Sequence, residues 1–164
     1  MIILYNPPSS ASRKPVLPMS LLAIGALLEE KHEYIIIDGN LENDPFSAIE
    51  AVINQHDVNV IGVTVMPGPQ LVNAAPLSER LKAHYPQVTI IWGGYFPTQH
   101  YDIALNADYV DYVVRGHGEE AFIALLDVLA KDSIPASLPG VAYRGPDGNM
   151  IAAPPAPIPH PDKL

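Results

Sequence analysis

An apolar run, a glycine pair and a proline follow one another in Val88-Thr89-Ile90-Ile91-Trp92-Gly93-Gly94-Tyr95-Phe96-Pro97-Thr98. The β-branched run is typical of a buried strand. The paired glycines let the backbone turn tightly where that strand ends, and Pro97 suits the first turn of a following helix. Because ligands of open α/β sheets bind outside the carboxyl ends of the strands, this turn predicts a binding loop.

Apolar runs of the same kind alternate with helical patterns along most of the chain. Strands are predicted at residues 2–5, 34–38, 58–65, 88–92 and 112–114, and helices at 18–31, 45–56, 69–84, 97–105 and 119–131. Near-continuous apolar strands that alternate with helices indicate a parallel sheet covered on both faces. The sequence therefore predicts an α/β protein with a doubly wound, mainly parallel five-stranded sheet of flavodoxin-like or Rossmann-like order.

The last part of the chain has a different character. Residues 141–144 and 150–152 are short apolar runs joined by Gly145-Pro146-Asp147-Gly148-Asn149, which predicts a small hairpin. Five prolines then fall within residues 153–162, where they favour an extended linker. We expect an α/β domain at 1–140, a hairpin extension at 141–152 and a proline-rich linker at 153–164 that leads to a further domain.

Composition narrows the class of protein. The 164 residues fit one domain, and 9 Lys and Arg against 18 Asp and Glu give a formal net charge of −9. That charge disfavours nucleic acid and anionic membranes as partners. The absence of cysteine excludes a disulfide, a thiolate nucleophile and an iron–sulfur ligand within this sequence. Without a basic leader before its first apolar segment, the chain is expected to be cytoplasmic.

The candidate site follows from the predicted strand order. In a 2-1-3-4-5 sheet the loops after strands one, three, four and five meet at one edge. These loops combine glycines, hydroxyls and apolar surface, a mixture that suits a broad ring with amide arms and a tail that lies in a slot. The candidate cofactor-binding residues are Asn6, Pro7, Pro8, Thr64, Met66, Gly68, Gly93, Gly94, Tyr95, Pro97, Gly116, His117, Gly118 and Glu119.

Several of these residues also have a purely structural interpretation. Gly93 and Gly94 also suit a tight turn alone, and Thr64 and Met66 also suit packing. His117 has no acidic residue at a spacing that forms a catalytic or metal-binding set. The sequence shows no nucleophile elbow or phosphate-binding loop. The chain alone is therefore predicted to be a non-catalytic binding module with no metal ligand of its own.

Five segments carry a resemblance to a known family. They are Leu4-Tyr5-Asn6-Pro7-Pro8, Pro18-Met19-Ser20-Leu21-Leu22-Ala23-Ile24-Gly25-Ala26-Leu27-Leu28, Ile36-Ile37-Asp38, Gly93-Gly94-Tyr95-Phe96-Pro97-Thr98 and Val114-Arg115-Gly116-His117-Gly118-Glu119-Glu120-Ala121-Phe122. In this order they resemble the amino-terminal cobalamin-binding domain of B12-dependent radical S-adenosylmethionine enzymes, such as anaerobic magnesium-protoporphyrin ester cyclase. The resemblance runs to about Arg144. It implies cobalamin as cofactor, and a following domain that holds a [4Fe-4S] cluster and S-adenosylmethionine for methyl transfer or cyclase-type chemistry.

Two positions depart from related patterns. Methionine synthase-type domains carry Asp-x-His-x-x-Gly after the first strand, whereas residues 6–12 of this chain contain no histidine. The resemblance therefore implies base-off, His-off cobalamin, whose lower face is left to water, to no ligand, or to a side chain such as Tyr5 or Asn6. The second departure is His117, which stands where the family loop often has glutamate.

Other functions use the same fold. A receiver domain needs acidic residues after the first strand, where this chain has Asn6-Pro7-Pro8. A flavodoxin needs a phosphate loop there, which Ser9, Ser10 and Ser12 supply in part. A degenerate domain without a cofactor, serving regulation or substrate docking, stays open as a third alternative.

Overall fold

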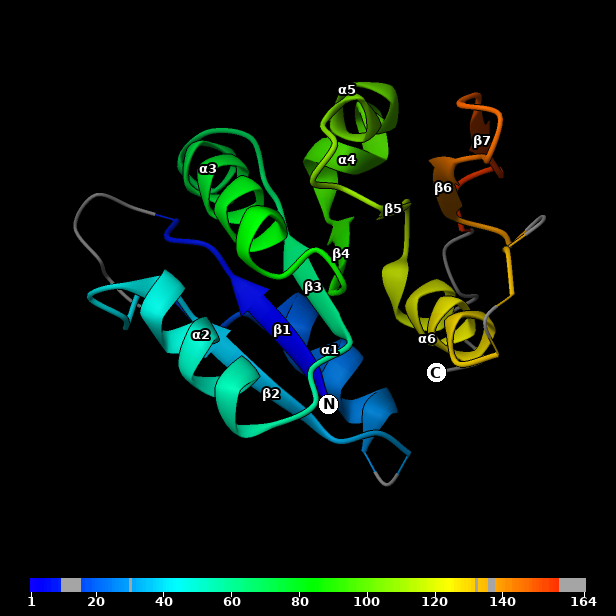
Figure 1. The fold of residues 1–164 in the computed structure, drawn as a ribbon. Helices are drawn as coiled ribbons and strands as arrows, with labels where there is room; N and C mark the ends of the chain where they lie inside the picture. The colour runs from blue at the N-terminus through cyan, green and yellow to red at the C-terminus, as the bar shows by residue number, and fades with distance from the viewer. Residues whose placement is uncertain (10–15, 30, 132, 136–137, 157–164) are drawn as a thin grey trace.

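The computed structural model describes residues 1–9, 16–29, 31–131, 133–135 and 138–156. Within these residues one sheet holds seven strands in the order β2-β1-β3-β4-β5-β6-β7 (Figure 1). The first five strands are parallel, and β6 and β7 are antiparallel additions at the β5 edge. The strands are β1 (Ile2–Asn6), β2 (Tyr34–Asp38), β3 (Val60–Thr64), β4 (Thr89–Gly93), β5 (Tyr112–Val114), β6 (Val141–Arg144) and β7 (Met150–Ala152).

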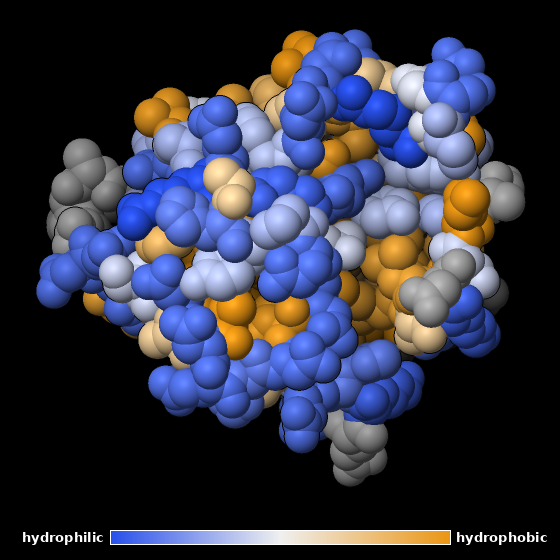
Figure 2. Space-filling view, in the orientation of Figure 1, coloured by the Kyte–Doolittle hydropathy of each residue, from blue (hydrophilic) through white to orange (hydrophobic). Residues whose placement is uncertain are grey.

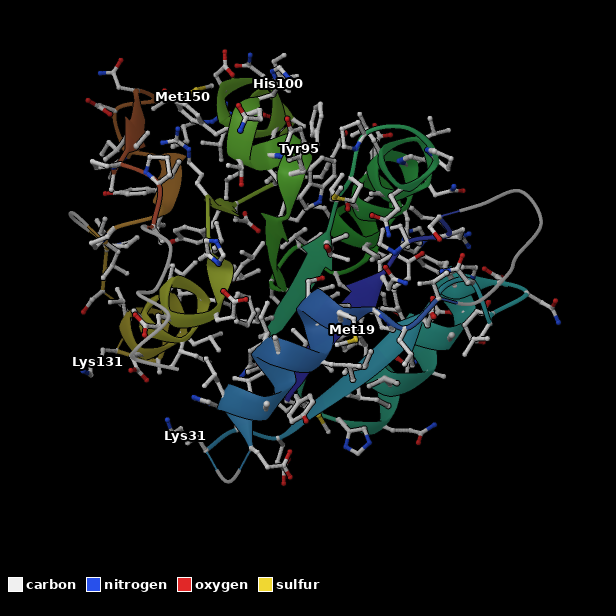
Figure 3. All side chains as sticks on the ribbon, turned by 180° about the vertical axis from the view of Figure 1, so that it is seen from behind. Met19, Lys31, Tyr95, His100, Lys131 and Met150 are labelled. Atoms are coloured by element: carbon white, nitrogen blue, oxygen red, sulfur yellow. The ribbon has the colours of Figure 1, made fainter. Side chains whose placement is uncertain are left out.

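Helices cover both faces of the sheet. Those of the described residues are α1 (Met19–Leu28), α2 (Pro45–Gln55), α3 (Pro69–His84), α4 (Tyr95–Gln99), α5 (Tyr101–Asn106) and α6 (Gly118–Leu129). Leu21 of α1 and Phe122 of α6 belong to the apolar core on one face, while Ile49 of α2 and Leu81 of α3 belong to the core on the other. Figure 3 shows the first face, with α1 in front of the sheet. The two apolar cores therefore lie on opposite faces of the sheet, each covered by helices.

The opposite face is the one seen in Figures 1 and 2. Mainly hydrophilic residues cover α2 and α3 there, and hydrophobic residues are visible in the hollows between elements (Figure 2). Phe46 and Ile49 of α2 are buried beneath this polar layer. This division of polar and apolar residues is what a helix lying on a sheet requires.

The predicted fold class is confirmed. Five parallel strands occur in the flavodoxin-like order, and their switch point lies between β1 and β3. The predicted hairpin also occurs, and it continues the same sheet because β6 pairs with the outer edge of β5, where Val141 lies opposite Val114. The described residues contain no helix that is both long and apolar enough to cross a membrane.

The helix predicted at 97–105 is two helices. Gly94 adopts φ +99°, so α4 begins at Tyr95, two residues earlier than predicted. His100, with φ −129° and ψ 47°, lies between α4 and α5 and interrupts the helical backbone. Pro97 occupies the third position of α4, still within its first turn.

The segment after the hairpin returns to the carboxyl edge of β5. Ala156 forms a parallel bridge with Gly116, and its N–H donates to the Arg115 carbonyl at 3.1 Å. The Gly140 N–H donates to the Pro154 carbonyl at 2.7 Å. These bonds place the first residues of the predicted linker beside the loop that follows β5. Residues 157–164 of that linker lie outside the described residues.

A candidate cofactor site at the carboxyl edge of the sheet

A cavity of about 150 Å³ opens at the carboxyl edge of the sheet, between α1, α6 and the strands β1, β3, β4 and β5. We call it the slot. Its buried wall is apolar, and its mouth is formed by the loops after β4 and β5. The described residues that line it are Leu4, Ser20, Leu21, Ile24, Gly62, Val63, Thr64, Ile91, Gly93, Gly94, Val114, Gly116, His117, Gly118, Glu119 and Phe122.

Two glycines make room for the slot. Gly62 lies in the middle of β3, and a Cβ there would stand 3.1 Å from the Phe122 ring. Gly93 ends β4, and the nearest atom to a Cβ built there is the Val114 carbonyl oxygen at 3.9 Å. Gly62 therefore lets α6 approach the sheet, while the space beside Gly93 belongs to the slot itself.

A third glycine fixes the shape of the mouth. Gly94 has φ +99°, and a Cβ there would lie 3.0 Å from the Val65 carbonyl oxygen. Thr98 links this turn to the next loop, because its hydroxyl donates to the Gly94 carbonyl at 2.7 Å and accepts from the Gly116 N–H at 3.0 Å. The two glycine loops at the mouth are thus held by one side chain.

Polar side chains are few in the slot. Ser20 Oγ on α1 and Thr64 Oγ1 at the end of β3 lie 3.5 Å apart, longer than the usual O–H···O bond of 2.5–3.0 Å. His117 and Glu119 line the mouth where α6 begins, and His117 makes no side-chain cap bond to that helix. Because they are 3.5 Å apart, the Ser20 and Thr64 hydroxyls can form better hydrogen bonds with a ligand than with each other.

Seven of the fourteen predicted site residues line the slot: Thr64, Gly93, Gly94, Gly116, His117, Gly118 and Glu119. The other seven do not line it: Asn6, Pro7, Pro8, Met66, Gly68, Tyr95 and Pro97. Met66 and Tyr95 are exposed, at 47% and 58% of their full surface, while Pro97 is buried in α4. Figure 3 labels Tyr95 at the start of α4.

Asn6 has a different role. Its side chain donates to Asp38 Oδ1 at 2.9 Å and accepts from Gln70 Nε2 at 2.8 Å. Gln70 Oε1 in turn accepts from the Met66 N–H at 3.0 Å, and Asp38 Oδ1 also accepts from the Asn40 side chain at 2.8 Å. This polar network joins the loops after β1, β2 and β3. The network holds these loops in place on the side of the carboxyl edge that is away from the slot.

Tyr5 also points away from the slot. It is buried in the core that α2 and α3 cover. Burial, and after it the nearby Asp38 carboxylate, raises the pKa of the Tyr5 phenol. The phenol therefore stays protonated at neutral pH. Among the described residues no three His, Cys, Asp or Glu side chains are grouped so that they could hold a metal ion.

The apolar half of the slot was not found from the sequence. Leu4, Leu21, Ile24 and Phe122 come from β1, α1 and α6, and a helical pattern does not say which strands a helix will face. One usable signal was present. Gly62 interrupts the apolar run of β3, and a glycine inside a strand often marks a close approach of another group.

Fold and slot together define an α/β ligand-binding module with its site at the switch-point edge of the sheet. The family model described as "B12 binding domain" matches residues 11–126. The chain belongs to the B12-binding domain family.

Curated relatives place this domain in larger proteins. The chain is 28% identical over 163 residues to the uncharacterized methyltransferase PH0819 of Pyrococcus horikoshii, covering 96% of this chain and 35% of that protein. It is 30% identical over 168 residues to the anaerobic magnesium-protoporphyrin IX monomethyl ester cyclase of Synechocystis sp., covering 96% of this chain and 33% of that protein. The chain thus spans about a third of the length of these relatives.

Solved structures share the fold. The cobalamin-dependent S-adenosylmethionine radical enzyme OxsB, with aqua-cobalamin and S-adenosylmethionine bound, matches 96% of this chain and 22% of its own with a TM-score of 0.81 at 16% identity. The radical S-adenosylmethionine methyltransferase TsrM of Kitasatospora setae, with cobalamin and a [4Fe-4S] cluster bound, matches 94% and 29% with a TM-score of 0.79 at 19% identity. The receiver domain of RcsB from Salmonella enterica serovar Typhimurium matches 81% and 90% with a TM-score of 0.54 at 19% identity.

Proposed function

We propose that this chain binds cobalamin, with the nucleotide tail in the slot and the corrin ring over the glycine loops at its mouth. The observation that carries the proposal is the slot of about 150 Å³ at the switch-point edge. An apolar cavity of that size can hold an aromatic ring. Family membership gives the same ligand class.

The residues around the mouth suit a large amphipathic ring. Gly93 lets a ligand approach closely, because it carries no side chain and the nearest neighbouring atom to a Cβ built there is 3.9 Å away. Exposed Met66 in the loop after β3 and exposed Tyr95 at the start of α4 offer apolar surface. Of the predicted site residues that do not line the slot, these two are proposed as contacts to the ring, whereas Asn6 is proposed to shape the loop after β1.

We further propose that cobalamin is bound base-off and His-off. Residues 6–12 contain no histidine, so the loop after β1 has no imidazole to offer. The Asn6 amide is already bonded to Asp38 and Gln70, and Tyr5 is buried on the other face as a neutral phenol. His117, at the mouth of the slot, is the competing imidazole.

The activity of the whole protein is also a proposal. Relatives about three times as long include a cyclase and a protein named as a methyltransferase. We propose that a following domain, joined through the proline-rich linker, binds a [4Fe-4S] cluster and S-adenosylmethionine and acts on an organic substrate in the cytoplasm. Cobalamin supplies a cobalt centre for group transfer or redox chemistry when bound. This chain's own residues bind and orient the cofactor.

A titration tests the binding proposal. The chain is incubated with hydroxocobalamin, or in parallel with flavin mononucleotide, and separated from free ligand by gel filtration. We expect a visible corrinoid spectrum to co-elute with the protein at about one equivalent, and no flavin spectrum. Co-elution of flavin alone would support the flavodoxin alternative, and a colourless protein in both cases would support the cofactor-free alternative.

A further inference from the structure

The wall of the slot is almost free of hydrogen-bonding groups at depth. Leu4, Ile91, Val114 and Phe122 are each at most 3% exposed, and Gly62 adds no side chain. Any polar atom that a ligand carried to this depth would lose its water without gaining a partner. The deep end of the slot therefore accepts apolar atoms and rejects polar ones.

Among the described residues that line the slot, hydrogen-bonding side chains occur only toward the opening. Ser20 is exposed on α1, and Thr64 ends β3, so both hydroxyls stand at the carboxyl-edge end of the slot. They are 3.5 Å apart, and Ser20 is the one partner that the described residues give the Thr64 side chain. A single acceptor atom placed near them could receive a bond from either hydroxyl.

We infer that the slot selects corrinoids by the chemistry of their lower base, favouring a benzimidazole over a purine. This inference rests on the proposed binding of cobalamin. A dimethylbenzimidazole base presents one free ring nitrogen near its attachment to the ribose and only carbon at its far edge. A purine such as adenine carries an amino group and further ring nitrogens at that edge, where the described residues of the slot wall are apolar.

The size of the expected preference follows from the unpaired groups. A purine base that enters the slot leaves its amino group or its ring nitrogens without partners among Leu4, Ile91 and Phe122. Burial of one such group lowers affinity by about tenfold. Loss of one hydroxyl bond at the opening, in Thr64→Val or Ser20→Ala, lowers affinity for cobalamin by about fivefold.

The test compares three corrinoids: cobalamin, its adenine-containing counterpart, and cobinamide, which has no nucleotide tail. Dissociation constants are measured by equilibrium dialysis for the unmodified chain, Thr64→Val and Ser20→Ala. Thr89→Val is the matched control, because it makes the same substitution at the opposite end of the neighbouring strand. We expect cobalamin to bind about tenfold more tightly than the adenine form, and both slot variants to lose affinity for cobalamin but not for cobinamide.

The possible contrary results distinguish failure of base selection from failure of cobalamin binding. Equal affinity for cobalamin and the adenine form would overturn base selection while leaving cobalamin binding intact. Failure of all three corrinoids to bind would instead overturn the proposed function. Loss of cobinamide and cobalamin binding together in Thr64→Val would reveal a general structural defect, and Ser20→Ala, on the exposed surface of α1, would then decide whether a slot hydroxyl bonds the base.

Discussion

Gln70 Nε2 donates to Asn6 Oδ1 at 2.8 Å, and this buried bond joins residues that are 64 positions apart in the chain. The other end of the Gln70 amide accepts from the Met66 N–H at 3.0 Å. One side chain thus ties the loop after β3 to the end of β1. Because these loops lie at the carboxyl edge, the bond affects both the stability of the sheet and the position of exposed Met66.

Gln70→Leu should destabilise the fold. It removes the amide that bonds Asn6 Oδ1 and the Met66 N–H, and it leaves the buried Asn6 Oδ1 without that donor, which costs about 1–3 kcal/mol of unfolding free energy. Thermal and urea unfolding of the variant measure this loss. Gln55→Leu, at the exposed last turn of α2, is the matched control and should unfold like the unmodified chain. Equal stability of the two variants would show that the amide network contributes nothing.

Gly93→Val should weaken cobalamin binding with little change in stability. Gly93 does not have a positive φ, and the nearest atom to a Cβ there is 3.9 Å away, so the new side chain projects into free space of the slot. We expect affinity to fall at least tenfold while the melting temperature stays close to that of the unmodified chain. Unchanged affinity in the folded variant would contradict the placement of the cofactor.

Gly94→Val, in contrast to Gly93→Val, should clearly lower the stability of the fold. Its φ of +99° is unfavourable for a β-branched residue, and its Cβ would meet the Val65 backbone at 3.0–3.1 Å. The variant is expected to unfold at a clearly lower temperature, as measured by circular dichroism. A Gly94→Val chain as stable as Gly93→Val would mean that the turn tolerates a side chain.

His117→Ala should leave cobalt coordination unchanged. Electron paramagnetic resonance of the bound cob(II)alamin form reports an axial nitrogen as superhyperfine splitting. We expect no such splitting in the unmodified chain, because the loop after β1 has no histidine. Splitting that disappears in His117→Ala would identify His117 as the lower ligand and refute the His-off proposal.

Asp44 should make the stability of α2 depend on pH. Its carboxylate accepts from the Ser47 hydroxyl at 2.7 Å and from the Phe46 N–H at 3.1 Å, and the Ser47 bonds are the main cause that holds the pKa of Asp44 below its ordinary value of 3.8. A carboxylate with a lowered pKa stabilises the fold above its unfolded pKa, and that contribution is lost as the pH falls through the folded pKa.

This expectation can be checked by measuring melting temperatures across pH 2–7 for the unmodified chain, Asp44→Asn and Asp44→Ala. The stabilisation by the Asp44 carboxylate should begin to fall below about pH 4. Alanine should destabilise most at neutral pH, and asparagine less because it keeps a capping oxygen. The advantage of the unmodified chain should shrink toward pH 2. A difference that does not change with pH would rule out the charge as its cause.

The sheet could be predicted from sequence because its strands are short, apolar and rich in β-branched residues. Tyr34–Asp38 and Tyr112–Val114 match the predicted limits. The limits of the helix after Gly94 could not be predicted in the same way. The positive φ of Gly94 and the irregular backbone of His100 decide where α4 and α5 begin, and neither leaves a clear mark in the residue pattern.

The glycine positions of the candidate site could be predicted from the sequence, because glycines mark the backbone turns at the ends of the strands. Gly93, Gly94, Gly116 and Gly118 lie in or next to the loops after β4 and β5, whose position follows from the strand order alone. The remaining wall depends on tertiary packing. Which side of α1 faces the sheet, and how closely Phe122 approaches Gly62, emerges only when both helices are packed.

The bridge between Ala156 and Gly116 has a practical consequence for attaching this protein to anything else. The Met1 ammonium group donates to the Asp57 carbonyl at 2.9 Å, at the edge where the strands begin. Ala156, by contrast, is hydrogen-bonded to the loop after β5, and this loop lines the slot. A tether to a sensor surface or a fluorescent reporter should therefore be fused ahead of Met1, because cargo attached close after Ala156 would crowd the opening through which a cofactor must enter.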